Sequence, residues 1–511
     1  MPRSRLLLSL AALAAGALSA IGFAPLDLWP ATLIGLAILI GLVGAAPRPR
    51  TAFLYGWLFG TGHFAIGLTW IATAFTFQAK MPQMLGWLAV VLLSMFLALY
   101  VGLASMLTRR IARGTIGRSF VFAAAWMLGE WLRGWVFSGF AWNPLGAAAL
   151  PIGGLGQLAA FIGALGLSGV IGVAGGSLWA MIEPKAPRRQ RLIGAALASS
   201  IAIAAGIAST IASPASDPGN PVIVIIQPNI GQDVKYAPGA DEAHLQTYLQ
   251  MTRDGLSRIA RRPALVLWSE SAVFGLPQQD PQLRARLAAV LGPGDLLLFG
   301  GVEAIRDING QVTALTNSLF VIDATGVLHG RYDKAHLVPL GEYVPMRTLM
   351  EAIGLARLTP GDIDFQPGPG PRTLVLPGMP AVGGQICYEI IFAGAVVDPD
   401  HRPLWIANIS NDAWFGPTGP PQHLAQTRLR AIEEGLPMAR ATPTGISAVT
   451  DARGHVIATS RLGEQVIISA TLPSPLPPTV FARLGQWASA GFGVVLLVIG
   501  IWVGRRSRVV E

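Results

Sequence analysis

The sequence predicts a bundle of membrane-spanning helices joined to one α/β domain. Of the 511 residues, 52% are apolar and 13% are charged, whereas a typical soluble chain carries about 25% charged residues. Long apolar stretches occupy residues 1–212 and return near the C-terminus, and a span needs roughly 20 such residues. Residues 220–472 instead alternate short strand-like and helical patterns, which is typical of a single α/β domain.

The apolar stretches predict about eight membrane spans, because each approaches the length that crosses a bilayer. They are Leu6–Ile21, Trp29–Gly44, Ala52–Thr73, Leu85–Leu107, Phe120–Phe137, Leu155–Ile182, Ile193–Ala212 and Trp487–Val503. Their many Gly and Ala residues favour close helix packing in lipid. The first stretch, basic and then apolar, has the pattern of a signal peptide. Because Ile21-Gly22-Phe23 lacks a clean small-residue cleavage site, we expect an uncleaved anchor.

Basic residues in the loops predict how the chain crosses the membrane. They precede the first span, follow the last and recur in alternate loops: Arg3 and Arg5, Arg48 and Arg50, Arg109–Arg118, Lys185–Arg191 and Arg505–Arg508. The other short loops carry almost none, with Lys80 as the exception. The positive-inside rule therefore places both termini in the cytoplasm and the α/β domain outside. The net charge of +9 thus reports topology and gives no evidence for a nucleic-acid groove.

Changes in composition predict the domain boundaries. We expect a seven-span membrane domain at 1–212, a Pro/Ser/Gly linker at 213–219 and the α/β domain at 220–472. A proline-rich linker at 473–486 then leads to a final transmembrane helix with a cytoplasmic tail at 487–511. Pro, Ser and Gly clusters of this kind usually separate folded segments.

Cys387, the only cysteine, is the first candidate catalytic residue. It follows Arg372–Met379, which has the pattern of a strand ending in a turn, and Gly383 and Gly384 precede it closely. Glycines allow unusual backbone conformations, so we expect one just before the thiol. Such a cysteine is a candidate nucleophile, although lone cysteines are more often small buried apolar side chains. One cysteine also excludes an intrachain disulfide.

Glu270 and Lys334 also follow strand-like segments. A thiol nucleophile needs a base for its proton and a cation for the oxyanion that forms on an acyl group. Catalytic groups of α/β folds gather at strand ends, so Glu270, Lys334 and Cys387 form a candidate set. Taken singly, Glu270 is a turn carboxylate and Lys334 an exposed lysine. Spacing alone does not show that the three meet.

Several motifs carry a resemblance to known proteins. Trp268-Ser269-Glu270, Tyr332–Pro339 and Cys387-Tyr388-Glu389 resemble the Glu–Lys–Cys pattern of the nitrilase superfamily. LVPLGEYVP at 337–345 and ISNDAWFG at 409–416, with the membrane flanks, resemble bacterial apolipoprotein N-acyltransferases over the whole chain. The resemblance implies that the α/β domain is a nitrilase-like αββα sandwich.

The resemblance also implies roles for individual residues. Cys387 would accept a fatty acyl chain as a thioester, Glu270 would be the general base, and Lys334 would stabilise the oxyanion. Three further residues would support the site: Glu342, Tyr388 and Glu389. No cofactor is implied. One departure is Tyr236, which stands where the family often has a tryptophan.

The implied reaction takes an acyl chain from a membrane phospholipid to the N-terminal amine of a diacylglyceryl-cysteine on an apolipoprotein. We expect the protein to work as a monomer in the bacterial inner membrane, with its catalytic domain in the periplasm. Tyr343–Phe365 mixes apolar residues with Gly and Pro, so it is either a mobile arm that receives lipid or a helix packed on the domain.

Two other functions remain open from the residues. A membrane-anchored nitrilase-type amidohydrolase would use the same catalytic residues and deliver the acyl group to water. A transporter with a ligand-binding outer domain would call for polar or broken spans, but the charges here cluster in loops. Within the membrane part, His63, Glu130 and Arg133 are ionisable and therefore noteworthy. Glu130 and Arg133 are three residues apart and predict an internal ion pair. The histidines show no metal-ligand spacing.

Overall fold

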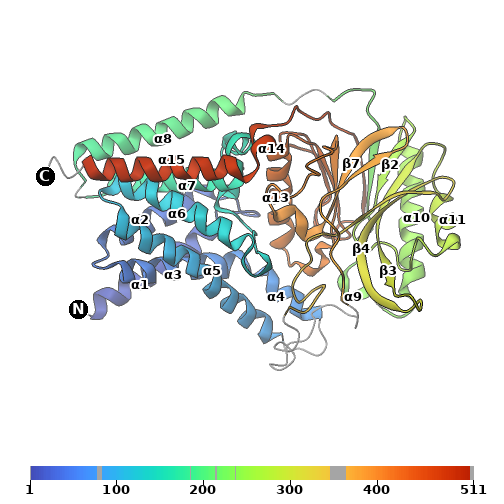
Figure 1. Cartoon of the computed structure of the whole chain (residues 1–511), viewed down its shortest axis with the longest axis horizontal. Coiled ribbons are helices and arrows are strands. Elements are labelled where there is room, and N and C mark those ends of the chain that lie inside the picture. Colours follow the sequence, from blue (N-terminus) through green and yellow to red (C-terminus); the bar gives the residue numbers. More distant parts are fainter. Residues whose placement is uncertain are drawn as a thin grey trace.

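The computed structural model describes residues 2–77, 83–184, 186–212, 216–235, 237–345 and 364–506. A bundle of helices and a pair of β-sheets lie end to end (Figure 1). The start of helix α1 and the end of helix α15 both lie at the end of the bundle that is farthest from the sheets (Figure 1).

The bundle is built from the apolar stretches of the sequence. Its helices are α1 (Pro2–Ala20), α2 (Trp29–Ala45), α3 (Pro49–Gly67), α4 (Trp70–Ala74), α5 (Met84–Ile111), α6 (Thr115–Arg133), α7 (Ala159–Ile182), α8 (Arg188–Ser209) and α15 (Gln486–Arg506). Proline begins α2 and α3 within their first two residues, where a missing N–H costs no helical hydrogen bond.

Each predicted span overlaps one of these helices, but not all of them meet the criteria for crossing a bilayer. In the described part of the chain, four do so by length and composition, namely α5, Leu155–Ile182, α8 and α15. Pro49–Gly67 with Trp70–Phe77, bent by 48°, would make a fifth. Arg5–Ala20 and Trp29–Ala45 are shorter apolar helices. The number of about eight spans therefore stays a prediction.

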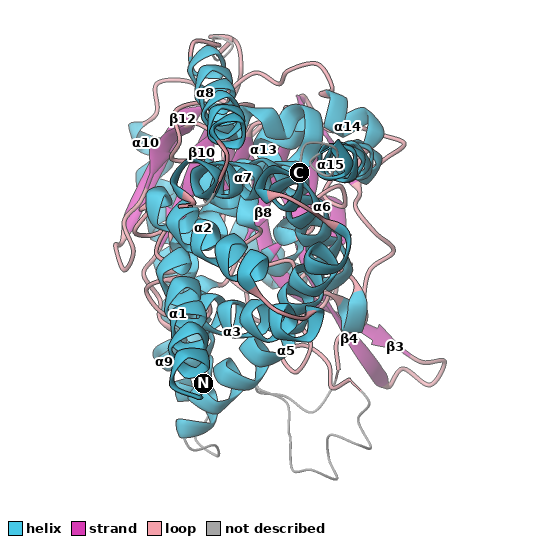
Figure 2. Cartoon of the chain, turned by 90° about the vertical axis from the view of Figure 1, so that its left-hand side faces the viewer, coloured by secondary structure: helices cyan, strands magenta, loops and turns pink. Residues whose placement is uncertain are grey.

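Large apolar side chains cover the outside of the bundle. Helix α8 lies at its margin (Figure 2) and has only 17% of its most apolar window buried, while α15 has 22%. Exposed apolar residues on α5, α8 and α15 include Trp87, Leu92, Leu192, Ile203, Val494 and Trp502. An apolar surface of this extent is typical of a protein that contacts lipid.

Two six-stranded sheets form the second half of the molecule. The first has the order β12-β1-β2-β3-β4-β5, with β1 (Val222–Gln227), β2 (Ala264–Leu267), β3 (Leu296–Arg306), β4 (Val312–Asp323), β5 (Leu328–Asp333) and β12 (Val466–Thr471). The second has the order β11-β10-β9-β8-β7-β6, with β6 (Thr373–Leu376), β7 (Met379–Ile386), β8 (Trp405–Ile409), β9 (Met438–Ala441), β10 (Ala448–Thr450) and β11 (Val456–Thr459). The inner strands β1–β3 and β7–β9 are parallel.

The sheets face each other and helices cover their outer faces. Side chains of both sheets, including Leu267, Leu319 and Ile409, form the core between them. Helices α10 (Ala240–Arg258) and α11 (Pro281–Ala288) pack on the first sheet, after the short helix α9 (Gln232–Lys235). Helix α13 (Gly419–Glu434) covers the second sheet, and α14 (Val480–Leu484) leads to α15. The predicted αββα sandwich is confirmed.

The sandwich joins the bundle through a shared apolar core. Phe59 and Leu167 of the bundle belong to the same buried cluster as Ile391, which follows β7, and Leu429 and Ile432 of α13. Helix α13 contacts α7 directly. The end of β7 therefore lies at the junction between the helices and the sheets.

Candidate active site

Glu270, Lys334 and Cys387 come together between the two sheets. Glu270 follows β2, Lys334 follows β5 and Cys387 follows β7. The ammonium Nζ of Lys334 lies 3.4 Å from Oε1 of Glu270, and the charges of both residues act on the Cys387 thiol. All three side chains are buried. Residues that are 64 and 53 positions apart therefore share one site, although they follow strands of both sheets: β2 and the edge strand β5 of the first sheet, and β7 of the second.

The backbone at Cys387 takes an unusual conformation. Its φ is +52°, in the left-handed region that side chains other than glycine seldom adopt and that occurs often at functional sites. Gly383 and Gly384 do not supply the unusual conformation expected just before the thiol, because both belong to β7 and neither has positive φ; it falls on Cys387 itself. Close packing is the reason for a glycine at position 384, because a Cβ there would lie 2.8 Å from the Tyr332 ring.

Glu389 ties the turn that carries the thiol to the segment that carries the lysine. Its Oε2 accepts a hydrogen bond from the Ile386 N–H at 2.8 Å. Its Oε1 accepts from the Tyr332 hydroxyl at 2.7 Å and from the N–H groups of Ala335 and His336 at 2.6 and 3.0 Å. Burial raises the pKa of Glu389 to about 7. This carboxyl group therefore acts as a buried clamp between the ends of β5 and β7.

Two carboxylates keep Lys334 charged. Burial opposes the charge, but Glu342 and Glu270 hold the pKa of Lys334 well above its ordinary value. Nζ lies 2.9 Å from Oε1 of Glu342. Asn317 donates from Nδ2 to Glu270 at 2.7 Å and to Glu342 at 2.8 Å, so it spaces the two carboxylates. Sequence reasoning missed Asn317, although an asparagine in the interior of a buried strand was a usable signal.

The strand that follows holds the backbone of Glu270 in place. Gly300 of β3 approaches so closely that a Cβ there would lie 2.6 Å from Cα of Glu270. The Gly300 N–H donates to the Ser269 carbonyl at 3.2 Å, and the Ser269 hydroxyl is 2.6 Å from that of Tyr248 on α10. The carboxylate is therefore presented from a backbone that is fixed on both sides.

Burial and then the negative charge of Glu270 raise the pKa of the Cys387 thiol, which Lys334 and Ser410 only partly oppose. The thiol is therefore protonated at neutral pH. Attack by its sulfur requires that a neighbouring base take the proton as the bond forms.

A buried histidine supports the turn from the other side. Nε2 of His423 donates to the Cys387 carbonyl at 3.1 Å, since a carbonyl only accepts. Nδ1 lies 2.9 Å from Nη2 of Arg440 and 3.1 Å from Oδ1 of Asp412, and the same Nη2 reaches Oδ2 of Asp412 at 2.6 Å. Burial and the charge of Arg440 lower the pKa of His423, which keeps the ring neutral. Sequence reasoning missed His423, although Asp412 lies in the recognised ISNDAWFG segment.

The site contacts the loop that follows α6. The Tyr388 hydroxyl donates to the Gly139 carbonyl at 3.0 Å, and Nε2 of His336 donates to the Ser138 carbonyl at 2.7 Å. Both donors flank the catalytic candidates in the chain. A displacement of this loop would therefore shift the residues next to Cys387 and Lys334.

Glu130 and Arg133 hold the same loop from within the bundle. The predicted ion pair is present at 3.5 Å. Glu130 also accepts from the Leu145 N–H at 2.6 Å, and Arg133 donates to the carbonyls of Trp142 and Asn143 at 2.8 and 3.2 Å. Their charges are used to fix the loop. His63 lies elsewhere, with Nδ1 2.7 Å from the Ser19 hydroxyl.

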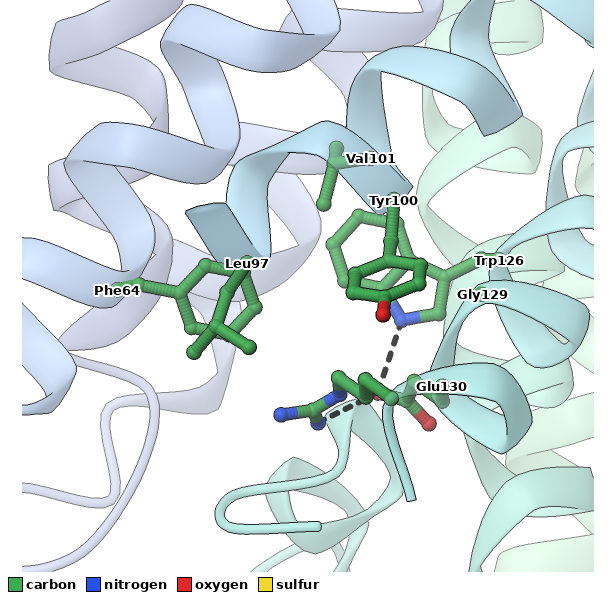
Figure 3. Close-up of a pocket in the computed structure, with 8 residues that line it drawn as sticks. Phe64, Leu97, Tyr100, Val101, Trp126, Gly129 and Glu130 are labelled. Carbon is green, nitrogen blue, oxygen red and sulfur yellow. Dashed lines mark hydrogen bonds and ion pairs between the residues drawn. The ribbon is translucent and has the colours of Figure 1, made fainter. Parts of the chain in front are cut away.

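Two cavities lie near this loop. The one in Figure 3, where the indole of Trp126 points toward Glu130, has about 10 Å³ of space, which is room for about one water. The other has about 400 Å³ and lies where α6 and α7 meet the sandwich. Its lining includes Trp131, Trp135, His336 and Phe392. Only the second is large enough for part of a lipid chain.

Some predicted features fall outside the described residues. These are Tyr236 and most of the Tyr343–Phe365 arm, of which 346–363 are not described. Within the described ranges, no group of three or more His, Cys, Asp and Glu side chains is arranged to hold a metal ion.

Comparison with known proteins gives the family. The profile described as "Apolipoprotein N-acyltransferase N-terminal domain" matches residues 15–177, and that described as "Carbon-nitrogen hydrolase" matches 225–476. A protein named apolipoprotein N-acyltransferase from Rhodopseudomonas palustris is 35% identical over 501 residues, 96% of this chain and 94% of its own. The chain belongs to the apolipoprotein N-acyltransferase family. Another member, from Bradyrhizobium diazoefficiens, is 36% identical over 98% of this chain and 95% of its own. The family resemblance of the motifs is confirmed.

Solved structures of the nitrilase superfamily resemble about half of the chain. An amidase from Nesterenkonia sp. AN1 is 17% identical and covers 51% of this chain and 94% of its own, with a TM-score of 0.35. A nitrilase-superfamily protein from Saccharomyces cerevisiae is 17% identical and covers 52% and 93%, with a TM-score of 0.36.

Proposed function

We propose that this protein transfers a fatty acyl chain from a membrane phospholipid to the N-terminal α-amine of the diacylglyceryl-cysteine of apolipoproteins, by way of a thioester on Cys387. The observation that carries the proposal is the buried Glu270–Lys334 contact of 3.4 Å beside the Cys387 thiol, in a chain of the apolipoprotein N-acyltransferase family. A base, a cation and a nucleophile are the parts that acyl transfer needs.

In the first half-reaction, Sγ of Cys387 attacks the ester carbonyl carbon of the phospholipid while Glu270 takes the thiol proton. The oxyanion that forms is stabilised by the Lys334 ammonium. When the tetrahedral intermediate collapses, the C–O ester bond breaks and the departing alkoxide takes the proton from Glu270. A lysophospholipid leaves, and the acyl chain stays on the sulfur.

In the second half-reaction, the α-amine of the diacylglyceryl-cysteine attacks the thioester carbonyl. Lys334 again stabilises the oxyanion. Collapse of the intermediate breaks the C–S bond, forms an amide and returns a proton to the thiolate. The two lipids occupy the site in turn, which makes the cycle ping-pong.

The position of the site suits substrates that stay in a bilayer. Each CH₂ taken from lipid into water costs about 0.8 kcal/mol, so the reacting ester must meet the thiol near the membrane face. The 400 Å³ cavity at the junction, lined by His336 and Phe392, supports entry of lipid from the bundle side.

We place the protein in the bacterial inner membrane with both termini in the cytoplasm and the sandwich in the periplasm, acting as a monomer. The basic loops support this orientation, as does the common position of the start of α1 and the end of α15, away from the sheets (Figure 1). The domain boundaries at 212, 219, 472 and 486 belong to the same proposal.

The test is the intact mass of purified protein after incubation with phospholipid, beside Cys387→Ala. We expect the wild type to gain one fatty acyl mass that hydroxylamine removes, and the variant to gain none. Adding a diacylglyceryl peptide should discharge the adduct and acylate the peptide amine.

Two other results would contradict the proposal. If Cys387→Ala still acylates the peptide, the cysteine is a packing residue. If the adduct forms but is lost to water as fast with the peptide as without it, the protein is an amidohydrolase-like enzyme rather than a transferase.

A further inference from the structure

Asn317 lies in the middle of the inner strand β4 and contacts three groups of the site. Its side chain is 5% exposed. Its main-chain carbonyl accepts a hydrogen bond from the Lys334 N–H at 2.8 Å. The hydroxyls of its neighbours Thr316 and Ser318 lie 2.9 Å from each other, on the opposite face of the strand. Asn317 therefore presents its amide to the catalytic candidates from regular backbone.

The amide closes a ring of polar groups between two carboxylates. Its Nδ2 donates to Oε1 of Glu270 at 2.7 Å and to Oε1 of Glu342 at 2.8 Å. The Lys334 ammonium contacts the same two oxygens, at 3.4 and 2.9 Å. Two carboxylates thus share one ammonium, and the NH₂ group of Asn317 supplies the donors that a second cation would otherwise provide.

The amide of Asn317 has only one workable orientation. The opposite orientation would point Oδ1 at two ionised carboxylates, which only accept hydrogen bonds. In the observed orientation Oδ1 is buried without a partner among the described residues, and an unpaired buried acceptor costs stability. The contacts of Nδ2 with the carboxylates are the interactions that offset this cost.

The ring leaves one oxygen of Glu270 unused. Asn317 and Lys334 both contact Oε1, and Oε2 has no hydrogen bond within the described ranges. A general base needs an oxygen that is free to accept the proton. Because Oε1 is held from two sides, Oε2 is the oxygen available for the proton of the Cys387 thiol.

Hydrogen bonds from Asn317 also favour the charged form of both carboxylates. Two carboxylates that share a site disfavour each other's ionisation, whereas donors to the ionised form favour it. The other charged or titratable groups that act on these two carboxylates in the described chain are Lys334, Cys387, Lys235 and His336. Of these, Lys334 is the one that contacts both carboxylates. Loss of the amide donors would therefore leave one ammonium to hold two negative charges.

We propose that Asn317 is a positioning residue for acyl transfer. Its NH₂ group keeps Glu270 and Glu342 ionised on either side of one ammonium and reserves Oε2 of Glu270 for the proton that leaves Sγ of Cys387. This role rests on the proposed function and adds no reacting group to it. The proton still passes from Sγ to Glu270, and the acyl chain still forms the thioester.

The experiment measures the rate of acyl-enzyme formation from phospholipid as a function of pH, by intact mass of the full-length protein. It compares wild type with Asn317→Asp and Asn317→Ala. The first variant keeps the volume and adds a carboxylate, and the second removes volume and adds no charge, so the two share only the loss of the NH₂ donor. We expect the acid limb of both profiles to lie about one to two pH units above that of wild type, the size expected for a hydrogen bond to a charged group.

Raising the pH should largely remove the defect, because Asn317 touches no reacting atom. Above the acid limb both variants should react within about tenfold of wild type, whereas Glu270→Gln, which removes the base, should be slower by about a hundredfold or more at every pH. Thr316→Val is the matched control, because it removes a buried hydroxyl one residue away in β4. It should leave the acid limb at the wild-type pH.

Three outcomes would overturn the inference. A loss of rate that is the same at every pH would show a structural role. An acid limb that moves in only one of the two Asn317 variants would assign the effect to volume or to added charge. An equal shift in Thr316→Val would assign it to the strand as a whole.

Two further measurements keep the result interpretable. Thermal unfolding in detergent is recorded for each variant, and Asn317→Ser, which also lacks the NH₂ group, replaces a variant that does not fold. Absence of an acyl adduct in the wild type would refute the proposed function instead, and it is recorded before the variants are compared.

Discussion

At the scale of residues, the site is a network of buried charges in which each member depends on the others. Lys334 stays charged because Glu342 and Glu270 flank it, and Asn317 donates to both carboxylates. Removing one partner from such a network leaves a buried charge or donor unpaired, which costs more than the bond itself contributed. Substitutions that keep size and change hydrogen bonding are therefore the most informative.

Glu389→Gln is one such change. The NH₂ group of an amide would replace one of the two carboxylate oxygens, and would then face either the Ile386 N–H or the N–H groups of Ala335 and His336, which now donate to the carboxylate. We expect unfolding free energy to fall by about 1–3 kcal/mol, the cost of buried unpaired polar groups, and acyl-enzyme formation to slow. Thermal unfolding in detergent and the mass assay measure the two effects.

Glu242→Gln is the matched control for Glu389→Gln. Its carboxylate is largely exposed and pairs with Arg286 at the surface, where ion pairs contribute little. The same chemical change there should leave the unfolding midpoint and the acylation rate at wild-type values. Equal effects of the two substitutions would show that the clamp has no special role.

At the scale of elements, the catalytic candidates follow the ends of strands, and a neighbouring strand fixes the position of one of them, Glu270. Glu270 depends on β3, which approaches its backbone through Gly300. The carboxylate is thus located by main chain as much as by its own side-chain contacts. A change in β3 that touches no charge should therefore still affect catalysis.

Gly300→Ala tests this dependence. The new Cβ would lie 2.6 Å from Cα of Glu270, so main chain must shift. A displacement of about 1 Å costs about a hundredfold in rate, and we expect a loss of this order in acyl-enzyme formation. Gly301→Ala is the control, because its Cβ meets only side chains, at 3.3 Å or more. Full activity of Gly300→Ala would contradict the argument.

At the scale of the whole molecule, the junction places the reacting groups next to the helical bundle. The apolar core runs from the helices into α13 and the turn after β7, and the Tyr388 and His336 side chains reach the loop after α6. The sandwich is therefore oriented against the membrane part and is not simply tethered to it. This arrangement fits the proposed topology, in which the sheets lie on one side of the bilayer.

Single-cysteine labelling tests that orientation. In the Cys387→Ala background, Ile308→Cys would present a thiol at the fully exposed tip of the β3–β4 hairpin, and Arg50→Cys one at the exposed start of α3. A membrane-impermeant maleimide should label the first in intact spheroplasts and the second only after permeabilisation. The reverse pattern would contradict the proposed topology.

The sequence by itself determined the features that depend only on residues close together in the chain. Apolar length predicted the helices of the bundle, and short runs of β-branched residues such as Val222–Ile226 predicted strands, because these signals need only neighbouring residues. The motifs around Glu270, Lys334 and Cys387 indicated the family. The run Arg372–Met379 was predicted as one strand that ends in a turn. In the structure it contains β6 and the turn after it, and its last residue already begins β7.

Only the tertiary structure decided which residues meet and in what protonation state. Asn317 and His423 come from separate elements; their local patterns mark them at most as unusual buried polar residues and do not place them beside Glu270 or Cys387. The positive φ of Cys387 is likewise imposed by contacts on both sides of the turn. Burial and charge act through space, so the chemistry of these groups depends on the packing of two sheets against a helical bundle.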